Sequence, residues 1–216
     1  MAVDGPMRRR GRPRAGDPPT PTEADVLARG MEAFAELGYA RASARELAKR
    51  LGVNHNFIND RYGSKATFWR AVLDEAMRWE LAQRREILDA DLDDEQRVRA
   101  VVELFYRASV RTPLLARLLA DEFCQESERL DYFYDHYLAP TLTALQPAVE
   151  RLAAAGRIPA TPPDVLFFAL ISPVAGLVQT PLATRLGREQ PLTREVQERA
   201  ARRLAQLVLD GLFGAR

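Results

Sequence analysis

One stretch decides the fold of this chain: Ser43-Ala44-Arg45-Glu46-Leu47-Ala48-Lys49-Arg50-Leu51-Gly52-Val53-Asn54. Ser43 can cap a short helix, and Glu46 follows at the spacing of a capping box. The buried stripe of that helix would consist of Leu47, Ala48 and Leu51. Gly52 suits a tight turn, because a turn between helices commonly needs a positive φ. Asn54 can cap the next helix, over residues 54–62, so the stretch predicts two short helices joined by a tight turn.

Helices are also predicted on both sides of this pair. Thr22 can cap the preceding helix, and Gly38 would end it as a left-handed C-cap. Between them a helical spacing connects Val26, Leu27, Gly30, Met31, Phe34 and Leu37. Gly63 would close the helix over residues 54–62. Ser64 can cap a fourth helix, whose inner face would carry Phe68, Val72 and Met77.

The remainder of the chain also follows a helical pattern, apart from an acidic loop within residues 89–95. Prolines should stop, kink or break several of these helices, since proline lacks an amide hydrogen. They are Pro113, Pro140, Pro147, Pro173 and Pro181. Thr193 can cap a long last helix. No strand pattern is found, so the chain is predicted to be all-α, with about nine helices.

Composition excludes several classes of protein. Of the 216 residues, 47% are hydrophobic, which allows a sizeable core. No apolar run reaches the roughly 18 residues that span a bilayer, and none follows the arginines at positions 8–10 as in a signal peptide. The single cysteine, Cys124, cannot form an internal disulfide, and we expect a cytoplasmic protein. Residues 1–65 hold 12 basic against 8 acidic side chains, so positive charge gathers where it could neutralise phosphates.

The quoted stretch, with Phe34-Ala35-Glu36-Leu37-Gly38-Tyr39 before it and Arg61-Tyr62-Gly63-Ser64-Lys65-Ala66-Thr67-Phe68 after it, resembles the DNA-binding domain of the tetracycline-repressor (TetR) family. The close resemblance covers roughly residues 22–77. It implies a three-helix DNA-binding domain of the helix-turn-helix type, followed by a C-terminal helical ligand-binding and dimerisation domain. We therefore expect a disordered basic arm at residues 1–20, the helix-turn-helix domain at 21–67 and the ligand-binding and dimerisation domain at 68–216.

The resemblance places a recognition helix at residues 54–62, which would lie in the major groove of DNA. Asparagines can bond adenine, Phe57 could touch a thymine methyl, and Ile58 should pack in the core. Lys65, at a helix start, would hold a phosphate. The candidate DNA-binding residues are Thr22, Ser43, Arg45, Asn54, His55, Asn56, Phe57, Asn59, Asp60, Arg61, Tyr62 and Lys65.

Two positions depart from the family pattern. Asn59 replaces a tyrosine that commonly contacts a phosphate, whereas Tyr62 replaces a phenylalanine and keeps the aromatic anchor. Asp60 would repel phosphates unless it pairs with Arg61 or accepts a hydrogen bond from a cytosine amino group. The run Arg8-Arg9-Arg10-Gly11-Arg12-Pro13-Arg14 is typical of a minor-groove arm, or of a tail that adds only non-specific affinity.

The second domain should supply a ligand pocket and a dimer interface. The candidate pocket residues are Phe105, Ser109, Phe123, Tyr137, Phe168 and Gln179, although an aromatic stripe at helical spacing can equally be plain core. The family implies a small apolar effector, and a homodimer through the last two helices. Such a dimer would bind a palindromic double-stranded operator, with half-sites about 34–36 Å apart. Repression relieved by the effector is expected, and activation stays open.

Other functions are weighed against this one. Cys124 and His136 could form a nucleophile and base, but no orienting partner, phosphate loop or metal-ligand spacing accompanies them. We therefore predict no catalytic residue, no metal, no cofactor and no membrane role. Cys124 is expected to be a buried structural cysteine, or else a sensor of oxidants and electrophiles. A DNA-binding protein of the same fold that senses no ligand is a further alternative.

Overall fold

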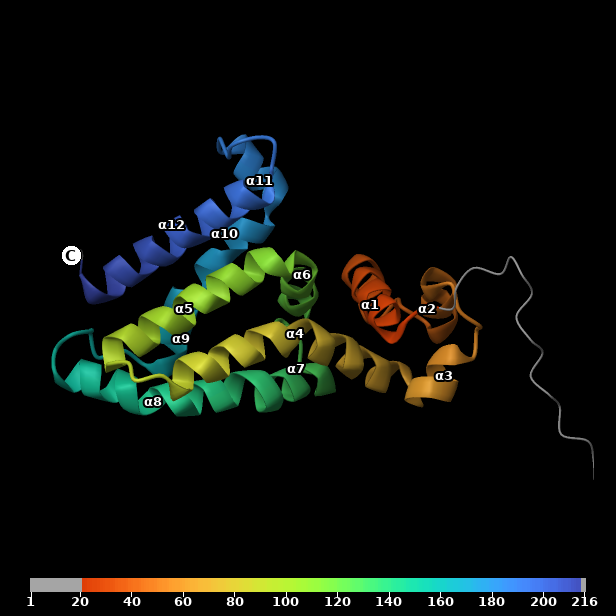
Figure 1. Cartoon of the computed structure of the whole chain (residues 1–216), viewed down its shortest axis with the longest axis horizontal. Coiled ribbons are helices and arrows are strands. Elements are labelled where there is room, and N and C mark those ends of the chain that lie inside the picture. Colours follow the sequence, from red (N-terminus) through yellow and green to blue (C-terminus); the bar gives the residue numbers. More distant parts are fainter. Residues whose placement is uncertain (1–20, 215–216) are drawn as a thin grey trace, which may run out of the picture.

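A computed structural model of the chain describes residues 21–214, so the expected basic arm at residues 1–20 lies outside the described residues. All elements of the described part are helical and no strand occurs in it, which confirms the all-α class (Figure 1). The helices are α1 (Glu23–Leu37), α2 (Ala44–Leu51), α3 (Phe57–Tyr62), α4 (Lys65–Asp89), α5 (Asp94–Arg111), α6 (Pro113–Glu122), α7 (Glu128–Phe133), α8 (Ala139–Ala154), α9 (Pro163–Ile171), α10 (Ala175–Val178), α11 (Thr180–Arg185) and α12 (Arg194–Phe213).

The predicted caps of the first helices are present, with two differences. The Thr22 hydroxyl accepts from the Asp25 amide at 3.2 Å, and the Asp25 carboxylate accepts from the Thr22 amide at 3.0 Å. At α2 only half of the expected capping box forms, because the Glu46 carboxylate accepts from Arg50 instead. Gly38 has a positive φ of 72°, but its ψ of 155° lies outside the left-handed helical region that was predicted.

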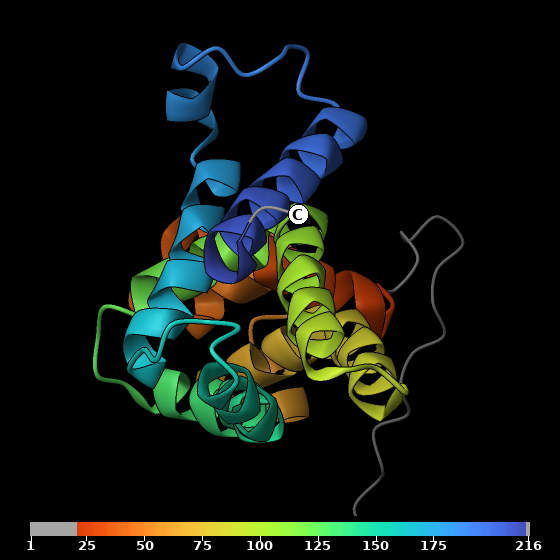
Figure 2. The same ribbon diagram turned by 90° about the vertical axis from the view of Figure 1, so that its left-hand side faces the viewer.

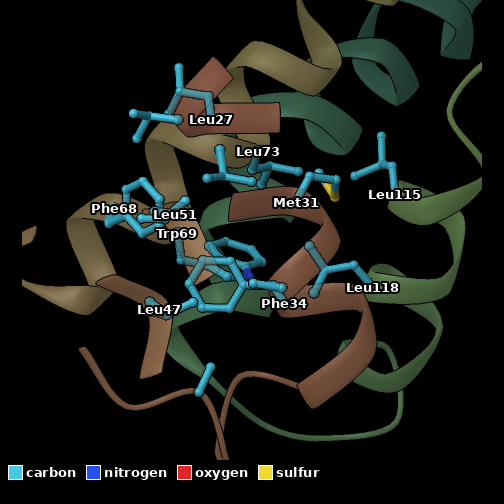
Figure 3. Packing of buried hydrophobic residues seen from close by; sticks show 14 of the residues in the cluster. Leu27, Met31, Phe34, Leu47, Leu51, Phe68, Trp69, Leu73, Leu115 and Leu118 are labelled. Carbon is cyan, nitrogen blue, oxygen red and sulfur yellow. The ribbon is translucent and has the colours of Figure 1, made fainter. Parts of the chain in front are cut away.

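The three N-terminal helices share a core with α4. Phe34, Leu47, Leu51, Phe68 and Trp69 are all fully buried in it (Figure 3). The core continues onto α6 through Leu115 and Leu118, so the α1–α3 unit is packed against the remainder of the chain (Figure 3). The long helix α4 begins beside α3 and runs from the α1–α3 unit to α5 and α8 (Figure 1).

A second core holds the C-terminal helices. Its buried members are Val98, Val102, Tyr106, Ala148, Leu152, Ile158, Leu177, Ala201, Ala205 and Leu209. They come mainly from α5, α8 and α12, and α5 packs along both α12 and α8. The α11 segment and its connection to α12 project beyond this core in both views (Figures 1 and 2).

Prolines divide the chain more finely than the expected nine or so helices. A π-helical turn, Tyr134–Leu138, joins α7 to α8, and Pro147 lies inside α8 without ending it. The apolar helix predicted after Pro162 ends at Ile171 and continues as the 3-10 turn Ser172–Val174 and two short helices. Pro113 begins α6 as well as ending the helix before it, since proline is well tolerated in a first helical turn.

Candidate nucleic-acid interface

The helix-turn-helix consists of α2, a left-handed Gly52 and α3. Gly52 has φ 69° and ψ 33°, as the sequence predicted. The second helix begins at Phe57, so the prediction that it starts at Asn54 is wrong by three residues. The Asn54 side-chain oxygen accepts from the Asn56 amide at 2.9 Å, and the Asn54 carbonyl accepts from the Phe57 amide at 2.9 Å. Asn54 therefore closes a local turn ahead of α3, which is the common competitor of helix capping for this side chain.

The α3 segment presents polar side chains to solvent and is anchored by apolar ones. Ile58 is fully buried, as expected, and Phe57 is half-buried with its ring 6.3 Å from that of Tyr62. The centroids of the Tyr62 and Phe68 rings lie 4.9 Å apart, so Tyr62 keeps the role of aromatic anchor. Burial raises the pKa of the Tyr62 hydroxyl. The exposed candidates on and before α3 are Asn54, His55, Asn56, Asn59, Asp60 and Arg61.

Charge on this surface is arranged differently from the expected Asp60–Arg61 pair. Arg61 lies 3.0 Å from Glu23 of α1, and the hydrogen bond with Glu23 raises the Arg61 pKa. Asp60 is exposed and makes no ion pair within residues 21–214. The Asp60 carboxylate is therefore free to accept hydrogen bonds from another molecule.

Lys65 begins α4 and is held in place. Its ammonium donates to the Tyr39 carbonyl at 3.0 Å and lies 4.1 Å from the centroid of the Tyr39 ring. Partial burial lowers the Lys65 pKa. A lysine ammonium has three donors, so two remain after the Tyr39 bond. Ser64 caps α4 by accepting from the Thr67 amide at 3.0 Å.

The remaining candidates for phosphate contact differ in whether their side chains already have partners within the described residues. The hydroxyls of Thr22 and Ser43 are both engaged as helix caps. Arg45 is exposed and has no ion-pair partner among the described residues. Lys49 was not among the predicted site residues, yet it is exposed and equally unpaired one turn further along α2. Its four-residue spacing from Arg45 was the available signal, since such residues share one helix face.

The candidate pocket residues do not converge on one place. Tyr137 belongs to the core shared with α1–α3, whereas Phe105 packs against the second core. Ser109 is buried, and its hydroxyl donates to the Phe105 carbonyl at 2.9 Å. Phe123, Phe168 and Gln179 are exposed. One surface hollow includes Gln179; it is lined by Gly176, Gln179, Leu182, Ala183, Leu186, Gly187 and Arg188.

Cys124 is exposed, which corrects the expectation of a buried structural cysteine. It follows the end of α6, where the chain turns over the surface, and its thiol donates to the Ala120 carbonyl at 3.6 Å. His136 stacks on Tyr132 with ring centroids 4.1 Å apart. Within residues 21–214 no cluster of side chains could hold a metal. None of the helices there has the length and hydrophobicity of a membrane span.

The N-terminal part of the chain is similar in sequence to known regulatory proteins. Residues 26–72 match the family model described as "Bacterial regulatory proteins, tetR family". The chain is 32% identical over 81 residues to the HTH-type transcriptional activator FasR of Mycolicibacterium smegmatis, covering 38% of this chain and 37% of FasR. It is 30% identical over 94 residues to the nucleoid occlusion factor SlmA of Vibrio campbellii, covering 43% of this chain and 48% of SlmA. The matches thus span less than half of each relative.

Solved structures also share the fold over most of the chain, and two of them serve as examples. A fatty acid metabolism regulator of Clostridium perfringens has a TM-score of 0.68 and 11% identity, covering 87% of this chain and 98% of its own. FadR of Bacillus subtilis in complex with stearoyl-CoA has a TM-score of 0.63 and 15% identity, covering 88% of this chain and 100% of its own. At these identities the likeness concerns the fold.

Proposed function

We propose that this chain, a member of the TetR family of bacterial regulatory proteins, is a ligand-responsive transcriptional regulator that binds a palindromic operator as a homodimer. The observation that carries the proposal is the α3 surface. Its polar side chains face solvent, while Ile58 and Tyr62 anchor the helix in the core that α1–α3 share with α4. A short helix held in this way can enter a major groove.

The exposed side chains of α3 and its neighbours suit different parts of DNA. Asn56 and Asn59 carry amides that can bond adenine edges, and the unpaired Asp60 carboxylate can accept from a cytosine amino group. Arg45 and Lys65 carry the positive charge for the phosphates on either side. We assign the reading of DNA to residues 21–67 and the dimer and ligand sites to residues 68–216.

The homodimer is supported by an uncovered apolar face. After Pro163 and Asp164, every residue of α9 is apolar, yet none is buried. Phe168 of α9 is 61% exposed, and Leu207 of α12 is 57% exposed. Apolar faces of this kind commonly bind another protein surface. In a two-fold dimer, each copy of the chain would cover α9 and α12 of the other. The last two predicted helices correspond here to α9, with the short segments that follow it, and to α12; α9 and α12 would then meet their counterparts across a two-fold axis.

A small apolar effector, with a long acyl chain as the first candidate, is proposed because the proteins that share the fold include a fatty acid metabolism regulator and a transcriptional regulator bound to stearoyl-CoA. Its test is a thermal shift with stearoyl-CoA, using free coenzyme A as the control. Binding would raise the melting temperature, because a ligand that binds only the folded state stabilises it. Release of bound DNA at the same stearoyl-CoA concentration would support the regulatory role.

A second candidate function is a DNA-binding protein that senses no ligand. It is favoured by the separation of the candidate pocket residues, since Tyr137 and Phe105 lie in different cores. One relative, SlmA, is described as a nucleoid occlusion factor. This candidate predicts that no apolar compound changes the affinity of the chain for DNA.

In vitro selection from random DNA duplexes tests the DNA-binding function. The purified chain should enrich a near-palindromic motif at a stated salt concentration. Binding that stays weak, strongly salt-dependent and equal for all sequences would rule out operator recognition.

A further inference from the structure

Arg129, an arginine of α7, contacts the ring of Tyr39, the same residue that holds Lys65. The guanidinium of Arg129, in α7, lies 3.9 Å from the centroid of the Tyr39 ring. The Lys65 ammonium lies 4.1 Å from the same centroid and donates to the Tyr39 carbonyl. Tyr39 stands in the connection between α1 and α2. One tyrosine therefore joins a cation from α7 to the cation that begins α4.

Arg129 is itself held by a buried carboxylate. Its Nε donates to Glu122 at 2.8 Å, and the second Glu122 oxygen accepts from the Ser127 hydroxyl at 3.0 Å. Glu122 is only 6% exposed and ends α6. A buried carboxylate needs such partners, because leaving it unpaired is costly. The position of Arg129 is thus set by the junction between α6 and α7.

Glu122 accounts for a cation at position 129, but the arrangement also places that cation close to a second one, Lys65. The charge of Arg129 contributes to lowering the Lys65 pKa, after the larger effect of burial. A phosphate bound at Lys65 would relieve the repulsion between the two cations.

We propose that Arg129 is a positioning residue for DNA binding: through the Tyr39 ring it fixes Lys65 for a phosphate contact, and so ties that contact to the α6–α7 junction. The inference rests on the proposed DNA-binding function. Stacking from Arg129 holds the ring, and the Tyr39 carbonyl then orients the ammonium with two donors free. A shift of α6 against α7 would loosen the ring and weaken the phosphate contact without any change in α3.

The test is a double-mutant cycle with Arg129→Gln and Lys65→Gln. Affinity for the duplex recovered by selection is measured by fluorescence anisotropy over a series of salt concentrations. Each single variant should weaken binding roughly fivefold. Each should also lower the slope of log affinity against log salt by about one, the value of one lost phosphate contact. In the Lys65→Gln background, Arg129→Gln should have no further effect, because the contact that it positions is already gone.

Two further variants keep the test decisive. Arg117→Gln removes the same charge from an exposed arginine of α6 that has no ion-pair partner among the described residues, and it should leave the slope unchanged. Arg129→Lys keeps a cation near Tyr39 and should restore part of the slope, which also shows that folding is intact.

The outcomes separate the inference from the function on which it rests. Additive losses would mean that Arg129 meets a phosphate itself, and an unchanged slope in Arg129→Gln would mean a merely structural role; either overturns the proposal while DNA binding stands. Failure of the unaltered chain to enrich any duplex would overturn both.

Discussion

Gly30 has no room for a larger side chain, so its replacement by alanine should destabilise the α1–α3 unit. It lies in α1 and faces two side chains of α4, Phe68 and Val72. A Cβ at this position would lie 2.7 Å from Phe68 Cζ and 2.8 Å from Val72 Cγ2. Both neighbours are almost fully buried, so neither can move away cheaply. Gly30→Ala therefore forces apart the helix pair that carries the candidate recognition surface.

Two opposing effects set the size of the change. Alanine is favoured over glycine inside a helix by about 1 kcal/mol. Overpacking of a tight core costs about 1–3 kcal/mol, and two contacts below 3.0 Å place this site at the upper end. We expect Gly30→Ala to lower the free energy of unfolding by about 1–2 kcal/mol.

Urea unfolding followed by tryptophan fluorescence measures this change, because Trp69 is buried in the same core. Gly211→Ala is the matched control, since a Cβ there meets no atom within 4 Å and α12 should gain stability. A Gly30→Ala chain as stable as the unaltered one, or more stable, would refute the packing argument.

Three further predictions concern other parts of the molecule. Thr22→Ala should lower stability by about 1 kcal/mol through loss of the α1 cap, as seen in urea unfolding. Hydrogen bonds from Thr22 lower the Asp25 pKa, so the deficit of Thr22→Ala should be full at neutral pH and shrink as the pH falls below about 4; a constant deficit would contradict this. Tyr106→Phe should lower the free energy of unfolding by about 1 kcal/mol, because it removes the hydrogen bond that the buried Tyr106 hydroxyl donates to the Leu170 carbonyl at 2.7 Å; equal stability in thermal unfolding would contradict it. Phe168→Glu should convert the dimer to monomer in sedimentation, whereas Leu142→Glu, on exposed α8 surface, should not; a Phe168→Glu dimer would exclude α9 from the interface.

Local chemistry made the N-terminal helices predictable. The caps at Thr22, Ser43 and Ser64 and the turn at Gly52 depend on neighbours within four residues, which the sequence displays. The start of α3 was misplaced because the Asn54 side chain can cap either a helix or a turn, and here it closes the turn.

Contacts between distant segments could not be read from the sequence. The pairing of Arg61 with Glu23, and the meeting of Arg129 with Tyr39, depend on how α1, α3 and α7 pack. The same holds for the exposure of Cys124 and Phe123, which lie where α6 gives way to α7. Helical spacing marks apolar faces, but it cannot tell a shared pocket from two separate cores.

The central claim is that α3 reads bases, and parallel DNA selections test it most directly. One selection uses the unaltered chain, and the other uses a chain with Asn56→Ala, Asn59→Ala and Asp60→Ala, which are all exposed and outside the core. If α3 reads bases, the first selection yields a palindromic motif with half-site centres about one helical turn apart. The second selection then yields the same salt dependence of binding with no motif. The same motif from both chains, or none from the unaltered chain, would show that α3 does not read bases.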